Sequence, residues 1–384
     1  MKIRVGVVGI GAMGQGIVQV IQRRSDMEVI AIADKNSNQL KKVEHLLSKG
    51  SLITRKPMDI INEELDVLVE ASTSVVEAAL LIIKALENKI NVVLMNSEVD
   101  QVFGRLLNKI AKKNCVVLTS DSGDQYGVLR RLIEDISFMG FKVVMAGNNK
   151  GFLDRYATPK TIEKEAAIRN LSLNQCTSYT DGTKLAIEMA IIANAMNLNL
   201  LKSGMIGPRV DDVNDALNAF DLDKARELGG VVDYILGAKP GGSVFVIAYS
   251  DDSDDQFYMN YYKMGNGPYY LFLRPYHLCH FETAQTIDRV IKYKEPVLVQ
   301  EKRILEVNAC VKTNLNSGTK LDGMGGYHLY GILEKPDRLP IGLSKDAVLI
   351  RNKKKDEQIY WEDVEFPEGD KRLELWEEQN KLNS

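Results

Sequence analysis

The sequence predicts an α/β protein with a Rossmann-type doubly wound parallel sheet, an α+β catalytic domain and a small β-rich module. Short β-branched runs alternate with helical patterns in the N-terminal third, and a glycine motif follows the first run. The length of 384 residues corresponds to two or three domains at about 150 residues each. We therefore expect domains at 1–120, 121–303 and 304–384.

The N-terminal segment has the pattern of a dinucleotide-binding βαβ unit. Residues 3–9 are β-branched and end in glycine, which predicts a buried strand. Gly9, Gly11 and Gly14 form Gly-x-Gly-x-x-Gly, and apolar residues at helical spacing follow. The next predicted strand ends at Asp34, which lies 20 residues beyond Gly14. This is the spacing of the acid that binds the adenosine ribose, so the combination predicts NAD or NADP as cofactor.

Each glycine has its own role in the predicted motif. Gly9 permits the tight turn, Gly11 lets the backbone approach the pyrophosphate, and Gly14 lets the helix pack closely on the strand. The pyrophosphate would accept hydrogen bonds at the positive end of the helix, where Ala12 and Met13 stand. The alternative is a glycine-rich turn in an α/β protein without a dinucleotide.

The residues at the end of the second strand leave NAD and NADP open. Asp34 would repel a 2′-phosphate, which favours NAD. Lys35 and Asn36 follow directly and can turn toward a 2′-phosphate, which would favour NADP. An exposed lysine after an acid is also commonly just solvated.

The alternation of strands and helices continues to residue 119. Strands are predicted at 66–70, 91–95 and 115–119, and a helix at 75–88. Ligands lie at the carboxyl ends of parallel strands, so we expect Ser72, Thr73 and Asn96 to contact the nicotinamide side of the cofactor. The same residue types also cap helices.

Two polar segments of the middle region are candidates for substrate chemistry. Asp124 lies in a cluster of acids, amides and glycines at a predicted strand end, where function commonly sits. Lys150 follows the predicted strand 141–146, among small residues. We expect it to face an anionic or carbonyl group. The alternative is a surface lysine in a turn.

A third candidate lies at the start of a strongly apolar helix predicted at 185–196. Lys184 and Glu188 are four residues apart and share a helix face. Charges at the start of a buried helix are costly unless they are paired. We therefore predict that Lys184 is an active-site proton donor tuned by Asp181 and Glu188. Capping of the helix by Thr183 or Asp181 is the simpler alternative.

The segment near residue 276 supplies the predicted substrate contacts. Arg274 suits bidentate binding of phosphate or carboxylate, and Tyr276 and His277 accompany it. His277 and His280 would share a face if both lay on one helix, which raises the possibility of a metal site. No second His/Cys group is evident, so polar substrate binding is favoured and any metal ligands are unknown.

Composition narrows the function class. The chain has 49 basic and 52 acidic residues, and this balance argues against nucleic acid as a partner. The four cysteines show no paired short spacing, which fits a reducing compartment. The apolar segment 5–21 imitates a signal peptide, but glycines interrupt it and no cleavage site follows. We expect a cytoplasmic protein without a membrane partner.

The quoted motifs resemble known proteins. Residues 7–14, 66–71 and 92–96 are similar to the homoserine dehydrogenase amino-terminal domain. That family typically has a lysine after the asparagine, whereas Ser97 and Glu98 follow here, which argues against homoserine as substrate.

The middle motifs narrow the resemblance to one subgroup. The motifs are Asp124-Gln-x-Gly127, Ala146-Gly-x-x-Lys-Gly151, Thr180-Asp-Gly-Thr-Lys184, Lys263-Met-Gly-x-Gly-Pro-Tyr-Tyr270 and Arg274-Pro-Tyr-His-Leu278. They resemble the homoserine dehydrogenase-like proteins that include a 1-deoxy-D-xylulose 5-phosphate reductoisomerase-like enzyme. The resemblance implies isoprenoid precursor synthesis by the MEP pathway and a possible Mg or Mn ion. It spans residues 3 to about 366. The C-terminal part, with its glycine-rich stretch at 321–327, resembles the small β-rich SAF fold.

These observations predict an NAD(P)H-dependent oxidoreductase that acts on the carbonyl of a small, anionic, phosphorylated substrate. The protein would orient the cofactor and stabilise the developing alkoxide. Two alternatives stay open: a dehydrogenase of an amino or hydroxy acid, and a dinucleotide sensor without catalysis. A homo-oligomer, either dimer or tetramer, is expected.

Overall fold

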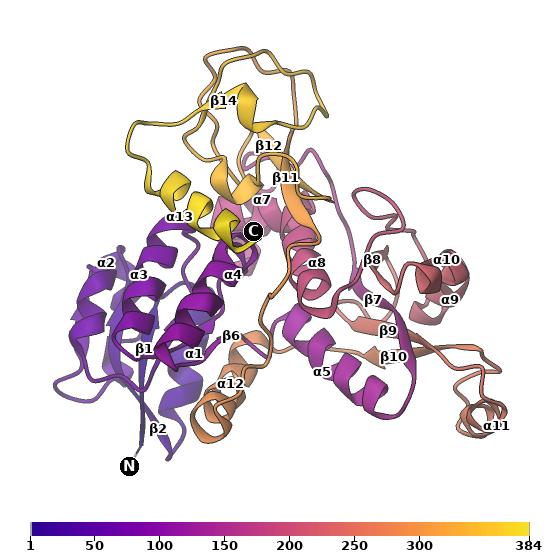
Figure 1. Ribbon diagram of the computed structural model, residues 1–384. Coiled ribbons are helices and arrows are strands. Elements are labelled where there is room, and N and C mark those ends of the chain that lie inside the picture. The colour runs from indigo at the N-terminus through magenta and orange to yellow at the C-terminus, as the bar shows by residue number, and fades with distance from the viewer. Residues whose placement is uncertain (1, 384) are drawn as a thin grey trace. The chain divides into compact units, whose positions relative to one another are not determined.

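The computed structural model describes residues 2–383 and divides the chain into two compact units (Figure 1). The first unit comprises Met1–Asp124, Leu278–Glu301 and Glu368–Ser384, and the second comprises Gln125–His277 and Lys302–Pro367. This division differs from the three consecutive domains that the sequence predicts. The chain returns to the first unit twice, at Leu278 and at Glu368. The predicted third module is therefore divided: its strands pack on a helix of the second unit, and its last segment belongs to the first.

The first unit is built on a parallel sheet of six strands. The strands are β1 (Ile3–Val8), β2 (Met27–Ala33), β3 (Leu52–Thr54), β4 (Val67–Glu70), β5 (Asn91–Leu94) and β6 (Leu118–Ser120), in the order β3-β2-β1-β4-β5-β6. The order reverses between β1 and β4, which is where dinucleotides bind in such sheets. The predicted fold class is confirmed.

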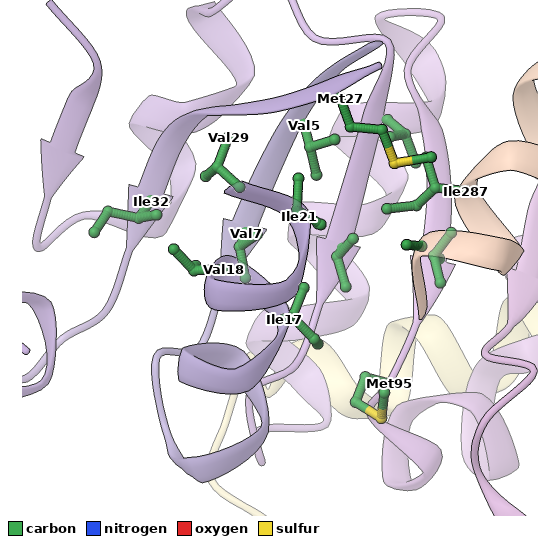
Figure 2. Packing of buried hydrophobic residues seen from close by; sticks show 14 of the residues in the cluster. Val5, Val7, Ile17, Val18, Ile21, Met27, Val29, Ile32, Met95 and Ile287 are labelled. Carbon is green, nitrogen blue, oxygen red and sulfur yellow. The ribbon is translucent and has the colours of Figure 1, made fainter. Parts of the chain in front are cut away.

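Helices cover this sheet. They are α1 (Ala12–Gln22), α2 (Ser37–Leu40), α3 (Val76–Glu87), α4 (Ser97–Asn114), α12 (Cys279–Tyr293) and α13 (Lys371–Asn380), with 3₁₀ turns at Glu44–Leu46, Pro57–Asn62 and Lys381–Asn383. Figure 2 shows the core that joins α1 to β1, β2 and α12. Val7, Ile17 and Ile287 are fully buried there. Each such side chain contributes about 1.5–3 kcal/mol when removed from water, so the late helix α12 is an integral part of the first unit.

The second unit contains a sheet of four strands in the order β10-β9-β7-β8. The strands are β7 (Lys142–Lys150), β8 (Val231–Leu236), β9 (Val244–Tyr249) and β10 (Tyr269–Arg274), and only β7 and β8 are parallel. Its helices are α5 (Gln125–Phe138), α6 (Glu163–Arg169), α7 (Leu173–Thr180), α8 (Thr183–Met196), α9 (Ala216–Ala219), α10 (Leu222–Glu227) and α11 (Ser253–Tyr261), with a 3₁₀ turn at Val213–Asp215.

The C-terminal part of the second unit is rich in short strands. It contains β11 (Glu306–Val311), β12 (Leu329–Glu334), β13 (Val348–Leu349) and β14 (Val364–Glu365), with 3₁₀ turns at Ile341–Leu343 and Trp361–Asp363. The antiparallel pair of β11 and β12 packs against α8. As predicted, α8 is buried on nearly all sides, with Leu185 to Asn194 all inaccessible.

Strand β7 is longer than the sequence predicts. The run 141–146 was expected to end before a flexible loop, but β7 continues through Lys150. Asn148 pairs in register with Val244 of β9, and Lys150 pairs with Leu236 of β8. Hydrogen bonding to both neighbours therefore holds the polar end of this strand, and Lys150 stands on a rigid element. No helix within residues 2–383 is both long and apolar enough to cross a membrane.

Candidate functional site

The glycine turn after β1 has the geometry that a dinucleotide requires. Gly9 has a φ of +87°, and a Cβ there would overlap the backbone of Ala71 and Ser72. A Cβ on Gly14 would overlap the carbonyl oxygen of Gly9, so α1 lies directly against the turn. The predicted roles of Gly9 and Gly14 thus agree with the backbone.

The start of α1 fits a pyrophosphate. A Cβ on Gly11 would meet nothing within 4 Å, so space is open beside this residue. Gly11 is the N-cap of α1, no side chain bonds the cap, and the first turn, which begins with Ala12 and Met13, contains no acid. Unoccupied N–H groups at a helix N-terminus bind phosphate oxygens. The backbone at the start of α1 could therefore bind the pyrophosphate of NAD or NADP.

Asp34 supports the glycine turn. Its Oδ2 accepts a hydrogen bond from Ile10 N at 2.7 Å, and its Oδ1 accepts one from Asn36 N at 2.7 Å. Each oxygen keeps a second lone pair for a ribose hydroxyl. Lys35 forms an exposed ion pair with Glu77 at 3.5 Å. Sequence reasoning missed Arg55, whose Nε donates to the carbonyl oxygen of Lys35, the residue after Asp34.

The predicted nicotinamide-side residues lie at the ends of β4 and β5. Asn96 caps α4, and its Oδ1 accepts hydrogen bonds from Glu98 N and Val99 N, each at 3.1 Å. Ser72 and Thr73 are not helix caps, because α3 begins after Val75. They lie in the loop after β4, next to the glycine turn.

Glu70, at the end of β4, is a buried acid that the sequence analysis did not select. Its Oε1 accepts a hydrogen bond from Ser72 N at 3.0 Å, and its Oε2 is buried without a hydrogen-bond partner in the described part of the chain. Burial raises the pKa of Glu70 to about 7. Burial also raises the pKa of Asp100 to about 6 and that of Asp121 to about 7. Glu70 could have been found from the sequence as a carboxyl group that ends an apolar strand, β4, beside which the strand order reverses.

Replacing Glu70 by glutamine should stabilise the protein above neutral pH. The unfolded carboxyl ionises near pH 4.5 and the folded one near 7, so the folded state binds more protons in this window and stability falls as pH rises through it. Glutamine removes this penalty, roughly 3 kcal/mol at pH 8. Thermal unfolding of Glu70→Gln and wild type should therefore coincide at pH 4.5 and differ by about 5 °C or more at pH 8. The exposed control Glu87→Gln should show no such trend, and an equal difference at both pH values would contradict the shift.

In the second unit, an ion pair joins the end of β7 to α8. Lys150 Nζ lies 3.4 Å from Glu188 Oε2, with the two side chains 17% and 2% exposed. Asn148 Nδ2 donates to the same oxygen at 3.4 Å. Asn148 and Lys150 are two residues apart and so lie on one face of β7. The pair leaves a partly accessible cation beside a buried anion.

Gln125, the first residue of α5, connects this pair to His277. With its amide nitrogen toward Glu188, Gln125 donates to Oε2 at 2.7 Å, and its oxygen accepts from Lys150 Nζ at 2.9 Å. In the opposite orientation of the amide, Gln125 Nε2 lies 3.3 Å from His277 Nε2, and in either case His277 Nδ1 lies 3.0 Å from the carbonyl oxygen of Gly242. A carbonyl only accepts, so Nδ1 carries the proton. Sequence reasoning missed Gln125 and Asn148 because amides give no distinctive signal.

The remaining predicted catalytic residues have different environments. Lys184 is buried in the first turn of α8, on the same element as Glu188. Asp181 pairs with Lys312 at 2.8 Å and caps Thr183 N, whereas the sequence predicts that it acts on Lys184. The sequence gives no sign of the pair with Lys312, because that residue lies 131 positions further along the chain. Asp124 is buried directly before α5.

The segment 274–280 does not form one helical face. Arg274 ends β10, and its guanidinium lies over the ring of Tyr276 at 4.9 Å. His277 precedes α12, whereas His280 lies in its first turn, against Gly16 of α1. The two histidines therefore do not share a helix face. Within residues 2–383, no group of three or more His, Cys, Asp or Glu side chains is placed to hold a metal ion.

Two family models match the chain. The NAD-binding domain of homoserine dehydrogenase matches residues 9–119, and the catalytic domain of oxidoreductase DRL matches residues 123–283. The first covers the glycine turn, Asp34 and Asn96. The second covers Gln125, Asn148, Lys150, Lys184 and Glu188. A search of the curated proteins finds no match.

Solved structures of dehydrogenases show weak similarity. A homoserine dehydrogenase from Thiobacillus denitrificans has 15% identity and a TM-score of 0.48, with 93% of this chain and 98% of that chain covered. A probable dehydrogenase from Thermotoga maritima has 14% identity and a TM-score of 0.47, with 77% and 90% covered. A myo-inositol 2-dehydrogenase from Lactobacillus plantarum has 12% identity and a TM-score of 0.46, with 77% and 91% covered. Similarities this low carry no argument about substrate.

The NAD-binding match coincides with a glycine turn and helix start that fit a dinucleotide, and the catalytic-domain match covers a lysine–glutamate pair whose carboxylate is buried. The chain is an NAD(P)-dependent oxidoreductase of the dehydrogenase kind.

Proposed function

We propose that the chain reduces the carbonyl group of a small phosphorylated sugar, with NAD(P)H as the hydride donor. The observation that carries the proposal is the Lys150–Glu188 pair, in which a partly exposed ammonium is held by a buried carboxylate. Such a cation can polarise a carbonyl and supply a proton to the oxygen.

The chain's own residues would act at the carbonyl oxygen. When bound, the cofactor supplies a hydride to the carbonyl carbon. Lys150 Nζ would stabilise the negative charge that develops on the oxygen and then transfer its proton to that oxygen. Gln125 and Glu188 hold the ammonium in place through the contacts at 2.9 and 3.4 Å. Lys184 is the second candidate donor, because it stands one turn before Glu188 on α8.

Arg274, Tyr276 and His277 are proposed to bind the anionic part of the substrate. Arg274 provides a guanidinium for phosphate oxygens, and its stacking on Tyr276 orients the planar group. The hydrogen bond of His277 Nδ1 to Gly242 fixes the ring plane. The formal net charge of −3 does not oppose this, because only local cations would meet the substrate.

The middle motifs resemble those of a 1-deoxy-D-xylulose 5-phosphate reductoisomerase-like enzyme, so 1-deoxy-D-xylulose 5-phosphate is the first substrate to test. With this substrate, a skeletal rearrangement would precede the reduction. The same resemblance implies a divalent cation, although no described group of three His, Cys, Asp or Glu side chains is placed to hold one. Turnover in EDTA, compared with turnover in added Mg²⁺ or Mn²⁺, tests whether a cation is needed.

A dehydrogenase of an amino or hydroxy acid is the second candidate. The match of residues 9–119 to the homoserine dehydrogenase NAD-binding domain favours it. This function predicts reduction of NAD(P)⁺ with homoserine and no need for a divalent cation.

A single panel tests both functions. The purified chain is mixed with NADH or NADPH and a series of phosphorylated sugars, and with NAD⁺ or NADP⁺ and homoserine, while the absorbance of the reduced nicotinamide is followed. Oxidation with 1-deoxy-D-xylulose 5-phosphate is the expected result. Tight cofactor binding without turnover of that sugar would exclude it as substrate, and turnover of homoserine alone would establish the second function. Binding of NAD(P)H with no turnover of any compound in the panel would favour a dinucleotide sensor without catalysis.

The homo-oligomeric state and the cytoplasmic location stay predictions. Within residues 2–383 no disulfide joins any of the four cysteines, as a reducing compartment would allow. Light scattering on the purified chain measures the oligomeric state directly.

A further inference from the structure

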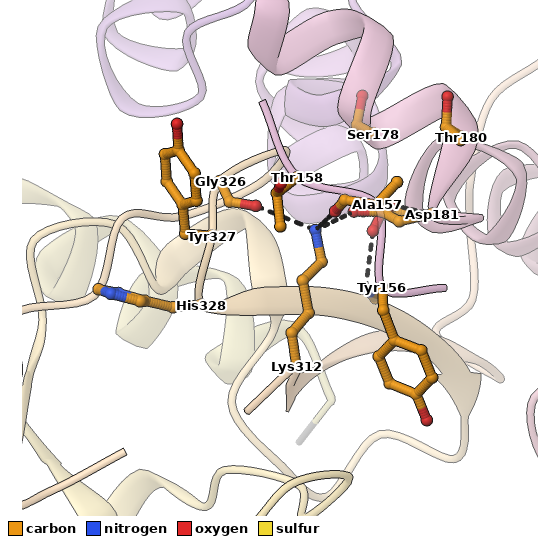
Figure 3. Close-up of polar contacts among 12 residues, drawn as sticks. Tyr156, Ala157, Thr158, Ser178, Thr180, Asp181, Lys312, Gly326, Tyr327 and His328 are labelled. Carbon is orange, nitrogen blue, oxygen red and sulfur yellow. Dashed lines mark hydrogen bonds and ion pairs between the residues drawn. The ribbon is translucent and has the colours of Figure 1, made fainter. Parts of the chain in front are cut away.

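Lys312 is a buried lysine outside the cluster described above. It follows β11 in the C-terminal part of the second unit, and its side chain is only 3% exposed. Its Nζ contacts Asp181 Oδ2 at 2.8 Å and donates to the carbonyl oxygens of Ala157 at 2.6 Å and Gly326 at 3.0 Å (Figure 3). An ammonium has three N–H groups, so each finds an acceptor.

Two of these acceptors are close in sequence to the proposed catalytic lysines. Ala157 belongs to the loop that leaves β7 after Lys150, and Asp181 precedes Lys184. Asp181 Oδ1 also accepts a hydrogen bond from Thr183 N at 2.9 Å, at the first residue of α8. One ammonium therefore joins the loop that follows β7, seven residues beyond Lys150, to the residue two positions before α8.

Helix α8 is attached to the C-terminal part at both ends. At its start, Thr183 Oγ1 accepts a hydrogen bond from Gly331 N of β12 at 2.8 Å. At its end, Asn194 Oδ1 accepts from Ile304 N at 2.8 Å and Leu305 N at 2.9 Å, and Asn194 Nδ2 donates to Leu305 O at 3.0 Å. Glu188 lies between these attachments.

The attachments matter because α8 is apolar on almost every side. The hydrophobic driving force is not directional, so apolar burial sets the rotation of this helix about its own axis less sharply than polar contacts do. Hydrogen bonds and buried charges do have direction, and they specify one arrangement. The rotation of α8 decides whether Glu188 faces β7.

We propose that Lys312 is a positioning residue, which holds α8 and the end of β7 so that Glu188 faces Lys150. This inference rests on the proposed function of the Lys150–Glu188 pair. It assigns a role to the C-terminal β segment, which sets the geometry of the groups that are proposed to act on the substrate.

The test uses a double variant, Asp181→Asn with Lys312→Met, in the full chain. Lys312→Met alone would leave a buried carboxylate without its cation, whereas the double variant removes both charges and keeps the cap on Thr183. The matched control is Lys353→Met with Asp363→Asn, which removes another largely buried pair of the same segment. Thermal unfolding confirms that both double variants are folded.

The measurement is the rate at which acetic anhydride modifies Lys150, followed by peptide mass spectrometry. Release of Lys150 from Glu188 should raise this rate at least three-fold in the Asp181→Asn/Lys312→Met variant. The rate at Lys353, which is also largely buried, should stay unchanged, because a general loosening would raise both. In the control variant, acetic anhydride should modify Lys150 at the wild-type rate. Both variants should keep their affinity for NADPH.

Two outcomes would overturn the inference: an unchanged rate at Lys150 in the folded double variant, or an equal increase at Lys353. If that variant does not fold, Thr183→Val decides in its place, since it removes the bond to Gly331 without changing charge. Labelling needs no substrate, so a chain that turns over none of the tested sugars refutes the proposed function without affecting this result. Where a substrate is turned over, kcat should fall in the double variant while the KM for NADPH is unchanged.

Discussion

Replacing Lys150 by methionine is expected to lower kcat for carbonyl reduction by about 10²–10⁴-fold, the usual contribution of a positioned acid. Methionine keeps the apolar stem but removes the ammonium that Gln125 and Glu188 hold. The affinity for NADPH should not change, because the glycine turn and Asp34 belong to the other unit. Steady-state kinetics with the substrate identified by the panel, together with fluorescence titration of NADPH, measures both quantities.

Lys142→Met is the matched control, because Lys142 is an exposed lysine on the same strand. It should retain wild-type kcat. Lys184→Met separates the two candidate donors: the lysine whose loss costs more in kcat is the donor. Wild-type kcat in both the Lys150 and the Lys184 variant would refute a role for this cluster in turnover.

The second large effect is expected for Gly11→Ala, which should lower NAD(P)H affinity at least tenfold, or about 1.4 kcal/mol. The space beside Gly11 is open in the protein, so the added methyl group meets no protein atom. Its φ of −71° suits alanine, so the melting temperature should be unchanged or slightly higher. The methyl group instead occupies the space through which a pyrophosphate would approach the helix start.

Gly14→Ala should behave differently, because its Cβ would overlap the carbonyl oxygen of Gly9. Forcing extra volume into a packed site costs about 1–3 kcal/mol, so this variant should lose both thermal stability and cofactor affinity. Gly241→Ala, at an exposed glycine with open space around it, is the control for both measurements. Unchanged NAD(P)H affinity in Gly11→Ala would show that the cofactor does not approach this turn.

Local patterns predicted the nucleotide-binding half of the first unit well. The β1 turn, α1, β2 and Asp34 form one continuous segment, and each element has its own periodicity or glycine requirement. Strand β3 was missed because it is only three residues long and none of its side chains is fully buried. The last two helices of this unit, α12 and α13, are recognisable as helices, but their packing on the sheet unit is a long-range event.

The candidate site was predicted only in part. Lys150, Lys184 and Glu188 stood out because charges beside apolar runs require partners. Two pairs could not be predicted, since Glu188 meets Lys150 across 38 residues and Asp181 meets Lys312 across 131. Lys312 sits in a stretch that looks like an ordinary strand end, and nothing local marks it as buried.

The sequence by itself determined the fold class, the dinucleotide motif and the set of charged residues that needed partners. Only the tertiary structure decided which charge meets which, that Lys150 ends a strand, and that Lys312 contacts Asp181 and Ala157. Periodicity records which face of an element is buried, because each element's own geometry repeats every two or 3.6 residues. It does not record what lies opposite that face, since a partner is set by packing of segments that are distant along the chain.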